Sequence, residues 1–225
     1  MKKSVGLTVA SLLVVIIGLF GMQLYRYSHQ AVVPLSPEQL AHFGAILYPT
    51  PRIVPPVSLT TQQGTAFDFD QFKGRWSLIN FGFTHCPDIC PVNMVQINQT
   101  QQRLIDLQMP TIGKYLVTLD PDRDTPAVLA AYLAGFGDDW TALWSQEPGI
   151  TAFAKSLNTV FLIDKTPATN NEQAMPHAQD HGYVVSHSDN IALLNPEGKF
   201  VGIFRPPHTP AAMAAVISNL MQSAP

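Results

Sequence analysis

The stretch Asn80-Phe81-Gly82-Phe83-Thr84-His85-Cys86-Pro87-Asp88-Ile89-Cys90-Pro91 contains both cysteines of the chain. Residues 76–83 are mostly apolar and partly aromatic, which predicts a short buried strand. Residues 92–107 carry apolar side chains at mixed spacings of three, four and seven, which predicts an amphipathic helix. We therefore expect Cys86 and Cys90 where a strand passes into the N-terminus of a helix.

This location predicts thiols that are reactive or bind a metal. The first helical turn has unpaired N–H groups and the positive end of the helix dipole, so the pKa of a cysteine there should fall below about 8.5. A spacing of four on one helical face places Cβ atoms roughly 5–6 Å apart, which suits two ligands of one soft ion. A disulfide needs about 3.8 Å. A non-helical Cys86 would close that gap, so a reversible disulfide remains open.

A purely structural disulfide is the alternative interpretation of the cysteine pair. It would close a very short loop, and short loops gain the least stability from a crosslink. Pro87 and Pro91 already make the turn rigid. A reactive or metal-binding dithiol is therefore favoured over a structural disulfide.

Composition and charge limit the possible functions. The chain has 225 residues, a net charge of −3 and no basic cluster, so we expect no nucleic-acid binding. Residues 5–24 are uncharged and follow Lys2 and Lys3. About 20 apolar residues span a bilayer, and no cleavage site of small residues follows them. We expect residues 1–27 to anchor a single-pass protein in the bacterial inner membrane, with its soluble domain in the periplasm.

The rest of the chain predicts one α/β domain. We expect a tether at 28–50, with a short helix capped by Ser36, and a folded domain at 51–225. The further predicted strands are 114–120, 140–144, 159–163, 183–188, 191–194 and 199–204, and the further predicted helices are 127–136, 148–157 and 210–221. Residues 165–182, which include the unmatched segment 166–181, are polar and are expected to form a loop. Alternating strands and helices with a final hairpin predict a three-layer fold, and the cysteine turn indicates a thioredoxin-like one.

Three motifs carry a resemblance to one family. They are Phe81-Gly82-Phe83-Thr84-His85-Cys86-Pro87-Asp88-Ile89-Cys90-Pro91, Val117-Thr118-Leu119-Asp120-Pro121-Asp122-Arg123-Asp124-Thr125-Pro126 and Tyr183-Val184-Val185-Ser186-His187-Ser188. Over about 51–221, the chain resembles the SCO/SenC family, thioredoxin-like copper proteins of cytochrome oxidase assembly. In the third motif, Ser186 stands where that family has aspartate.

The resemblance implies a site that the residues alone do not determine. None of the seven histidines can be placed near the cysteines by sequence reasoning, but the family motif makes His187 the third metal ligand beside Cys86 and Cys90. Asp120 has two possible roles. It supports the site or contacts a partner, or it simply forms a turn at the end of a strand. Because Ser186 is neutral, its effect on copper affinity and on the preferred oxidation state stays open.

Two classes of function follow. Two thiolates and an imidazole suit Cu(I) or Cu(II), whereas a closed structural zinc site prefers four ligands. The first hypothesis is a metallochaperone that delivers copper to the CuA-bearing subunit of cytochrome c oxidase or another copper protein, or prepares its cysteines. The second is a membrane-anchored thiol–disulfide oxidoreductase that uses the dithiol of Cys86 and Cys90. Metal binding needs His187, and dithiol exchange does not. A peroxidase of the same fold would need a different cysteine motif.

Overall fold

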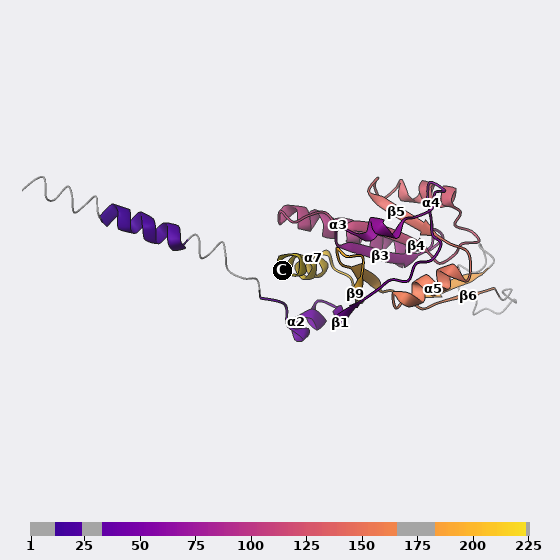
Figure 1. Cartoon of the computed structure of the whole chain (residues 1–225). Helices are drawn as coiled ribbons and strands as arrows, with labels where there is room; N and C mark the ends of the chain where they lie inside the picture. The colour runs from indigo at the N-terminus through magenta and orange to yellow at the C-terminus, as the bar shows by residue number, and fades with distance from the viewer. Residues whose placement is uncertain (1–11, 24–32, 166–182, 224–225) are drawn as a thin grey trace, which may run out of the picture.

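A seven-stranded sheet organises the fold (Figure 1). The computed structural model describes residues 12–23, 33–165 and 183–223. The strand order is β1-β9-β8-β3-β4-β5-β2. The bounds of these strands are β1 Ala45–Arg52, β2 Thr60–Thr61, β3 Ser77–Gly82, β4 Gly113–Thr118, β5 Trp140–Trp144, β8 Ile191–Leu194 and β9 Phe200–Phe204. Strands β3, β4 and β5 run parallel, and the other pairs are antiparallel.

A separate two-stranded sheet pairs β6 (Phe161–Asp164) with β7 (Val184–His187) in antiparallel register. Phe161 lies opposite His187, and Leu162 lies opposite Ser186. The predicted loop between these strands, 166–182, lies outside the described residues. This small sheet positions His187, the histidine of the third motif.

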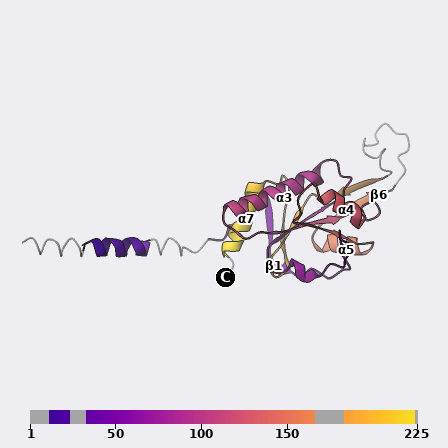
Figure 2. The ribbon, with the colours of Figure 1, turned by 90° about the horizontal axis from the view of Figure 1, so that it is seen from above.

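Helices cover both faces of the large sheet and give the three predicted layers (Figure 2). The helices are α2 Pro37–His42, α3 Ile89–Asp106, α4 Pro126–Leu133, α5 Gly149–Ser156 and α7 Pro210–Ser223, with a 3-10 helix at Phe69–Phe72. One core packs α3, α4 and α7 on the sheet, and the other packs α5 and the 3-10 helix on the opposite face.

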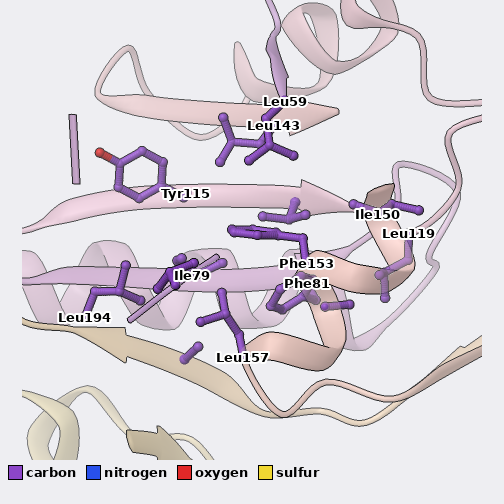
Figure 3. Close-up of a cluster of buried hydrophobic side chains, with 14 of the residues drawn as sticks. Leu59, Ile79, Phe81, Tyr115, Leu119, Leu143, Ile150, Phe153, Leu157 and Leu194 are labelled. Carbon is purple, nitrogen blue, oxygen red and sulfur yellow. The ribbon is translucent and has the colours of Figure 1, made fainter. Parts of the chain in front are cut away.

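Strand β3 shows why the two cores form. All six of its residues are buried, as is typical of a central strand covered on both faces. Because side chains alternate along a strand, Leu78 enters the core beneath α3, whereas Ile79 and Phe81 enter the core beneath α5. Figure 3 shows Phe81 beside Phe153 of α5, and their ring centroids are 6.0 Å apart. The strand that leads to the cysteine turn is thus rigidly held.

The predicted N-terminal transmembrane helix is not found. Helical residues are described from 12 to 23, and no helix in the described part of the chain is long and apolar enough to cross a membrane. A span needs about 20 residues. The remaining residues of the predicted anchor, 1–11 and 24–27, lie outside the described residues.

The folded region begins earlier than the predicted boundary at residue 51. Strand β1 starts at Ala45, within the predicted tether, and pairs with β9 at the edge of the sheet. Pro49 and Pro51 lie in this strand, where the register is irregular. An edge strand tolerates proline because one side of its backbone needs no partner, so the prolines do not mark a linker here. The predicted short helix is present as α2, capped by Ser36.

Candidate metal and dithiol site

The two cysteines lie at the junction of β3 and α3. Strand β3 ends at Gly82, and α3 begins at Ile89, so Cys86 lies in the turn and Cys90 in the first helical turn. Both thiols are free, and the backbone N–H of Cys90 faces Cys86 Sγ at 3.5 Å. Cys86 is therefore non-helical and close to Cys90, which is the geometry that keeps both metal binding and a reversible disulfide available.

Gly82 allows Cys90 to approach the end of β3. A Cβ atom at residue 82 would lie 2.9 Å from Cys90 Sγ and 3.1 Å from Cys90 Cβ. Such distances are too short for a side chain to be added without movement of Cys90. The glycine of the cysteine motif thus has a steric role that its sequence position alone did not reveal.

His187 reaches the same point from strand β7. Its Nε2 atom lies 3.6 Å from Cys90 Sγ, and its Nδ1 atom lies 3.0 Å from the carbonyl oxygen of Ser188. Because a carbonyl oxygen can only accept a hydrogen bond, Nδ1 carries a hydrogen, and in its neutral form the ring presents the Nε2 lone pair to Cys90. The ring of Phe83 packs edge-on against the imidazole, with centroids 6.2 Å apart.

The two thiols have opposite electrostatic environments. The hydrogen bond from the Cys90 thiol, assisted by His187 and backbone N–H groups, lowers the pKa of Cys86 to about 4. The Cys86 thiolate and burial together raise the pKa of Cys90. The depressed pKa expected from the sequence thus falls on Cys86, but its main cause is the neighbouring thiol rather than the helix terminus. The pair thus consists of a partly exposed thiolate, Cys86, and a buried thiol, Cys90.

The charge of His187 is set by competing effects. Burial of the ring disfavours the imidazolium, but the hydrogen bond to Cys86 and the contact with the Ser188 carbonyl outweigh burial and raise the pKa of His187. A thiolate beside an imidazolium is an arrangement that activates cysteine nucleophiles. Loss of that proton would leave the Nε2 lone pair free to bind a metal ion.

The donor set fits a soft metal ion. At a tetrahedral angle, metal–sulfur and metal–nitrogen bonds of about 2.3 and 2.0–2.1 Å separate the two ligand atoms by roughly 3.5 Å. The observed 3.6 Å between Cys90 Sγ and His187 Nε2 matches this separation. Nevertheless, the described part of the chain contains no group of three or more His, Cys, Asp or Glu side chains already arranged as a metal site. Cys86, which is partly exposed, would have to turn toward the other two donors.

Asp124 holds the cysteine turn in place. This buried carboxylate accepts hydrogen bonds from the backbone N–H of Thr84 at 2.9 Å and from the hydroxyl groups of Thr84 and Thr118. Burial, only partly offset by these bonds, raises the pKa of Asp124. Asp124 does not cap the neighbouring helix α4, whose N-cap is Thr125. Only the tertiary contact with Thr84 reveals its role.

Asp120 connects the second and third motifs. It is buried and accepts hydrogen bonds from Arg123 and from the hydroxyl group of Tyr183. The Arg123 guanidinium also lies 3.9 Å from the centroid of the Tyr183 ring. Since Tyr183 directly precedes β7, Asp120 supports the strand that carries His187, which favours the supporting role over a simple turn former.

A pocket of about 320 Å³ opens beside the site. Its lining includes Cys86 and His187, and the apolar side chains of Phe83, Pro87 and Ile89 form much of its wall. Arg123 and Tyr183 lie at the same pocket. Cys86 is therefore reachable from solvent through a largely apolar opening, while Cys90 is not exposed.

These features define a thioredoxin-like protein with a dithiol after its central strand β3 and a histidine from the small second sheet beside it. The chain belongs to the SCO1/SenC family, whose model matches residues 47–222. A protein of Stutzerimonas stutzeri, named provisionally as copper-binding, is 31% identical over 80% of this chain and 82% of its own length. The human mitochondrial SCO1 homolog is 28% identical over 84% of this chain, which spans 58% of that protein.

Solved structures of relatives share the fold. Yeast Sco1 with copper bound is 27% identical, with a TM-score of 0.65 over 78% of this chain and 91% of that one. Bradyrhizobium japonicum ScoI with copper bound is 29% identical, with a TM-score of 0.57 over 74% and 98% of the two chains. The predicted thioredoxin-like fold and family are thus confirmed.

The predicted localisation needs correction. Relatives from human, mouse and cattle are named as mitochondrial proteins. The described residues also contain no helix that could span a membrane. The prediction of a single-pass protein of the bacterial inner membrane, with a periplasmic domain, is contradicted by these findings.

Proposed function

We propose that this chain is a metallochaperone that binds one copper ion through Cys86, Cys90 and His187. The single observation that carries the proposal is the contact between Cys90 Sγ and His187 Nε2 at 3.6 Å, next to a second thiol. Thiolate and imidazole ligands suit copper, whereas harder ions such as magnesium prefer oxygen ligands. Relatives solved with copper bound support copper as the metal.

The recipient of the copper is a copper protein, and the CuA-bearing subunit of cytochrome c oxidase is the proposed one. BsSco, whose solved structure is similar to this chain, is described as a member of the Sco family of cytochrome c oxidase assembly proteins. Three protein ligands leave a soft ion open to a donor from a partner. Cys86 is partly exposed and Cys90 is buried, so a partner thiol reaches Cys86 first and we expect transfer to begin with exchange at Cys86.

Thiol–disulfide exchange is the second candidate function. It is favoured by the unequal thiols, since Cys86 is a partly exposed thiolate and Cys90 a buried thiol. Cys86 would attack a partner disulfide, form a mixed disulfide and release one partner thiolate. Cys90, losing its proton, would then attack Cys86 Sγ, close the Cys86–Cys90 disulfide and release the second partner thiolate. Two electrons pass to the partner, whose cysteines are then ready for copper.

A titration of the reduced, metal-free protein tests the copper proposal. We expect one Cu(I) per chain, and no tight binding in Cys86→Ser or Cys90→Ser. Met94→Leu is the matched control, because it removes the sulfur of a buried side chain one helical turn after Cys90. This variant should still bind one Cu(I) per chain. Full-strength binding by both cysteine variants would refute the proposal.

A further inference from the structure

A buried polar network lies behind the two ligands from α3 and β7. Asn93, on α3, follows Cys90 by three residues and so shares its helical face. Its Nδ2 atom donates to Asp189 Oδ1 at 2.5 Å and to Asn80 Oδ1 at 3.4 Å. Asn93 is only 3% exposed, so these bonds are shielded from water. The helix of Cys90 is thereby tied to the turn that follows His187.

His208 secures the same turn from the opposite side. It precedes α7, and its Nε2 atom donates to the carbonyl oxygen of Asp189 at 2.9 Å. Nε2 also lies 3.7 Å from Asp189 Oδ1, and the His208 side chain is 2% exposed. Asp189 is therefore held both through its side chain, by Asn93, and through its backbone, by His208.

The network acts on both ligand-bearing elements at once. Asp189 stands between β7, which ends at His187, and β8, which begins at Ile191. Its negative charge contributes to raising the pKa values of Cys90 and His187. Ser186, where the family has aspartate, is exposed and carries no charge. Among the residues that follow His187, Asp189 is thus the carboxylate that faces the site.

We propose that Asp189 is a positioning residue, which holds His187 against Cys90 through its hydrogen bond with Asn93. This inference rests on the proposed copper function for its consequence, but not for its geometry. Without the bond, β7 and α3 are free to shift relative to each other. The histidine ligand then no longer lies at bonding separation from the Cys90 sulfur.

Copper titrations of Asp189 and Asn93 variants provide the first test. Changes that misorient a ligand cost roughly 10–100-fold in metal affinity, so Asp189→Ala should weaken Cu(II) by about this factor. The Cu(II)–thiolate absorption band should shift, and Cu(I), which two thiolates can hold, should change less. Asn93→Ala should reproduce the effect, and the double variant should be no worse than either single one because both remove the same bond.

The variant Asp189→Asn separates position from charge. Its amide oxygen can still accept from Asn93, so we expect near-native Cu(II) affinity and spectrum. If Asp189→Asn is as weak as Asp189→Ala, charge governs the effect and the positioning role is refuted. Asp122→Ala removes an exposed carboxylate that pairs with Lys165, and it is the control for net charge.

A metal-free readout keeps this inference distinct from the copper proposal. The imidazole NMR signals of His187 should shift or broaden in Asp189→Ala and Asn93→Ala, and stay native in Asp189→Asn and Asp122→Ala. Thermal melts identify variants that fail to fold, and Asn93→Ala carries the test if Asp189→Ala is one of them. If the native chain binds no copper, the proposed function fails, while the ring signals still decide the inference. Unchanged ring signals in both alanine variants would overturn it.

Discussion

Cys90 Sγ and His187 Nε2 lie 3.6 Å apart although 97 residues separate them in the chain. The cysteine comes from the first turn of α3, and the histidine comes from the end of β7. Two separate supports maintain the contact: Gly82 makes room for the sulfur, and Tyr183, bound to Asp120, precedes the histidine strand. The site is thus assembled by tertiary packing rather than by one local motif.

The first prediction concerns the titration of Cys86. Because the Cys90 thiol lowers the pKa of Cys86 to about 4, alkylation of Cys86 should stay fast well below pH 7. The variant Cys90→Ala removes the donor, so the alkylation midpoint should rise toward the ordinary value of about 8.5. Cys90→Ser keeps a hydroxyl donor and should fall between the two. A native midpoint at or above about 8.5 would contradict the account.

The second prediction concerns Gly82. In Gly82→Ala the new methyl group would meet Cys90 Sγ at 2.9 Å, so Cys90 must move. We expect a loss of roughly 1–3 kcal/mol in the free energy of unfolding, as is typical of overpacking, and weaker copper binding. Gly135→Ala is the control because its added Cβ would meet only an ordinary contact at 3.5 Å. Urea unfolding and copper titration measure both effects; equal behaviour of the two variants would argue against a steric role for Gly82.

The third prediction concerns pH and Asp124. Burial raises the pKa of Asp124 in the folded chain above its unfolded value. Between these two pKa values the folded state binds more protons than the unfolded state. The contribution of Asp124 to the free energy of unfolding therefore falls as pH rises through that window. Asp124→Asn has no such titration. The stability of the native chain relative to Asp124→Asn should therefore fall as pH rises from about 4, and a constant or rising difference in urea unfolding would contradict this.

The fourth prediction concerns Ser186. Its side chain is exposed, and neighbours on a strand point to opposite faces, so Ser186 faces away from the side that His187 presents to Cys90. Ser186→Asp restores the family residue and adds charge, and we expect Cu(II) to bind more tightly. The effect should stay below the roughly 10–100-fold range of groups that contact a ligand. Competition titration measures it, and weaker Cu(II) binding would contradict the expected sign.

The sequence predicted those parts of the fold that local patterns determine. The expected strands 76–83 and 114–120 correspond to β3 and β4, and the expected closing hairpin is formed by β8 and β9. Helix α3 begins three residues before the predicted start at 92. Pro91 does not prevent this, because the N–H groups of the first helical turn have no helical partner in any case.

Long-range features could not be predicted from local patterns. The edge strand β1 contains two prolines and resembled a linker until its pairing with β9 was known. The pairing of β6 with β7 fixes the histidine strand across a long connection. His187 was expected as a ligand only through the family resemblance. The contact between Asp124 and Thr84 spans 40 residues, and no spacing in the sequence indicates it.

Copper binding by His187→Ala tests the central claim most directly. Cu(II) favours imidazole nitrogen, while two thiolates can hold Cu(I) in a linear arrangement. Competition titrations of the native chain and His187→Ala should therefore show a large loss of Cu(II) affinity and a smaller loss for Cu(I). His42→Ala, which removes a histidine of α2 outside the site, should match the native chain. If His187→Ala bound both copper states as tightly as the native chain, the ligand assignment would be contradicted and thiol–disulfide exchange would become the favoured function.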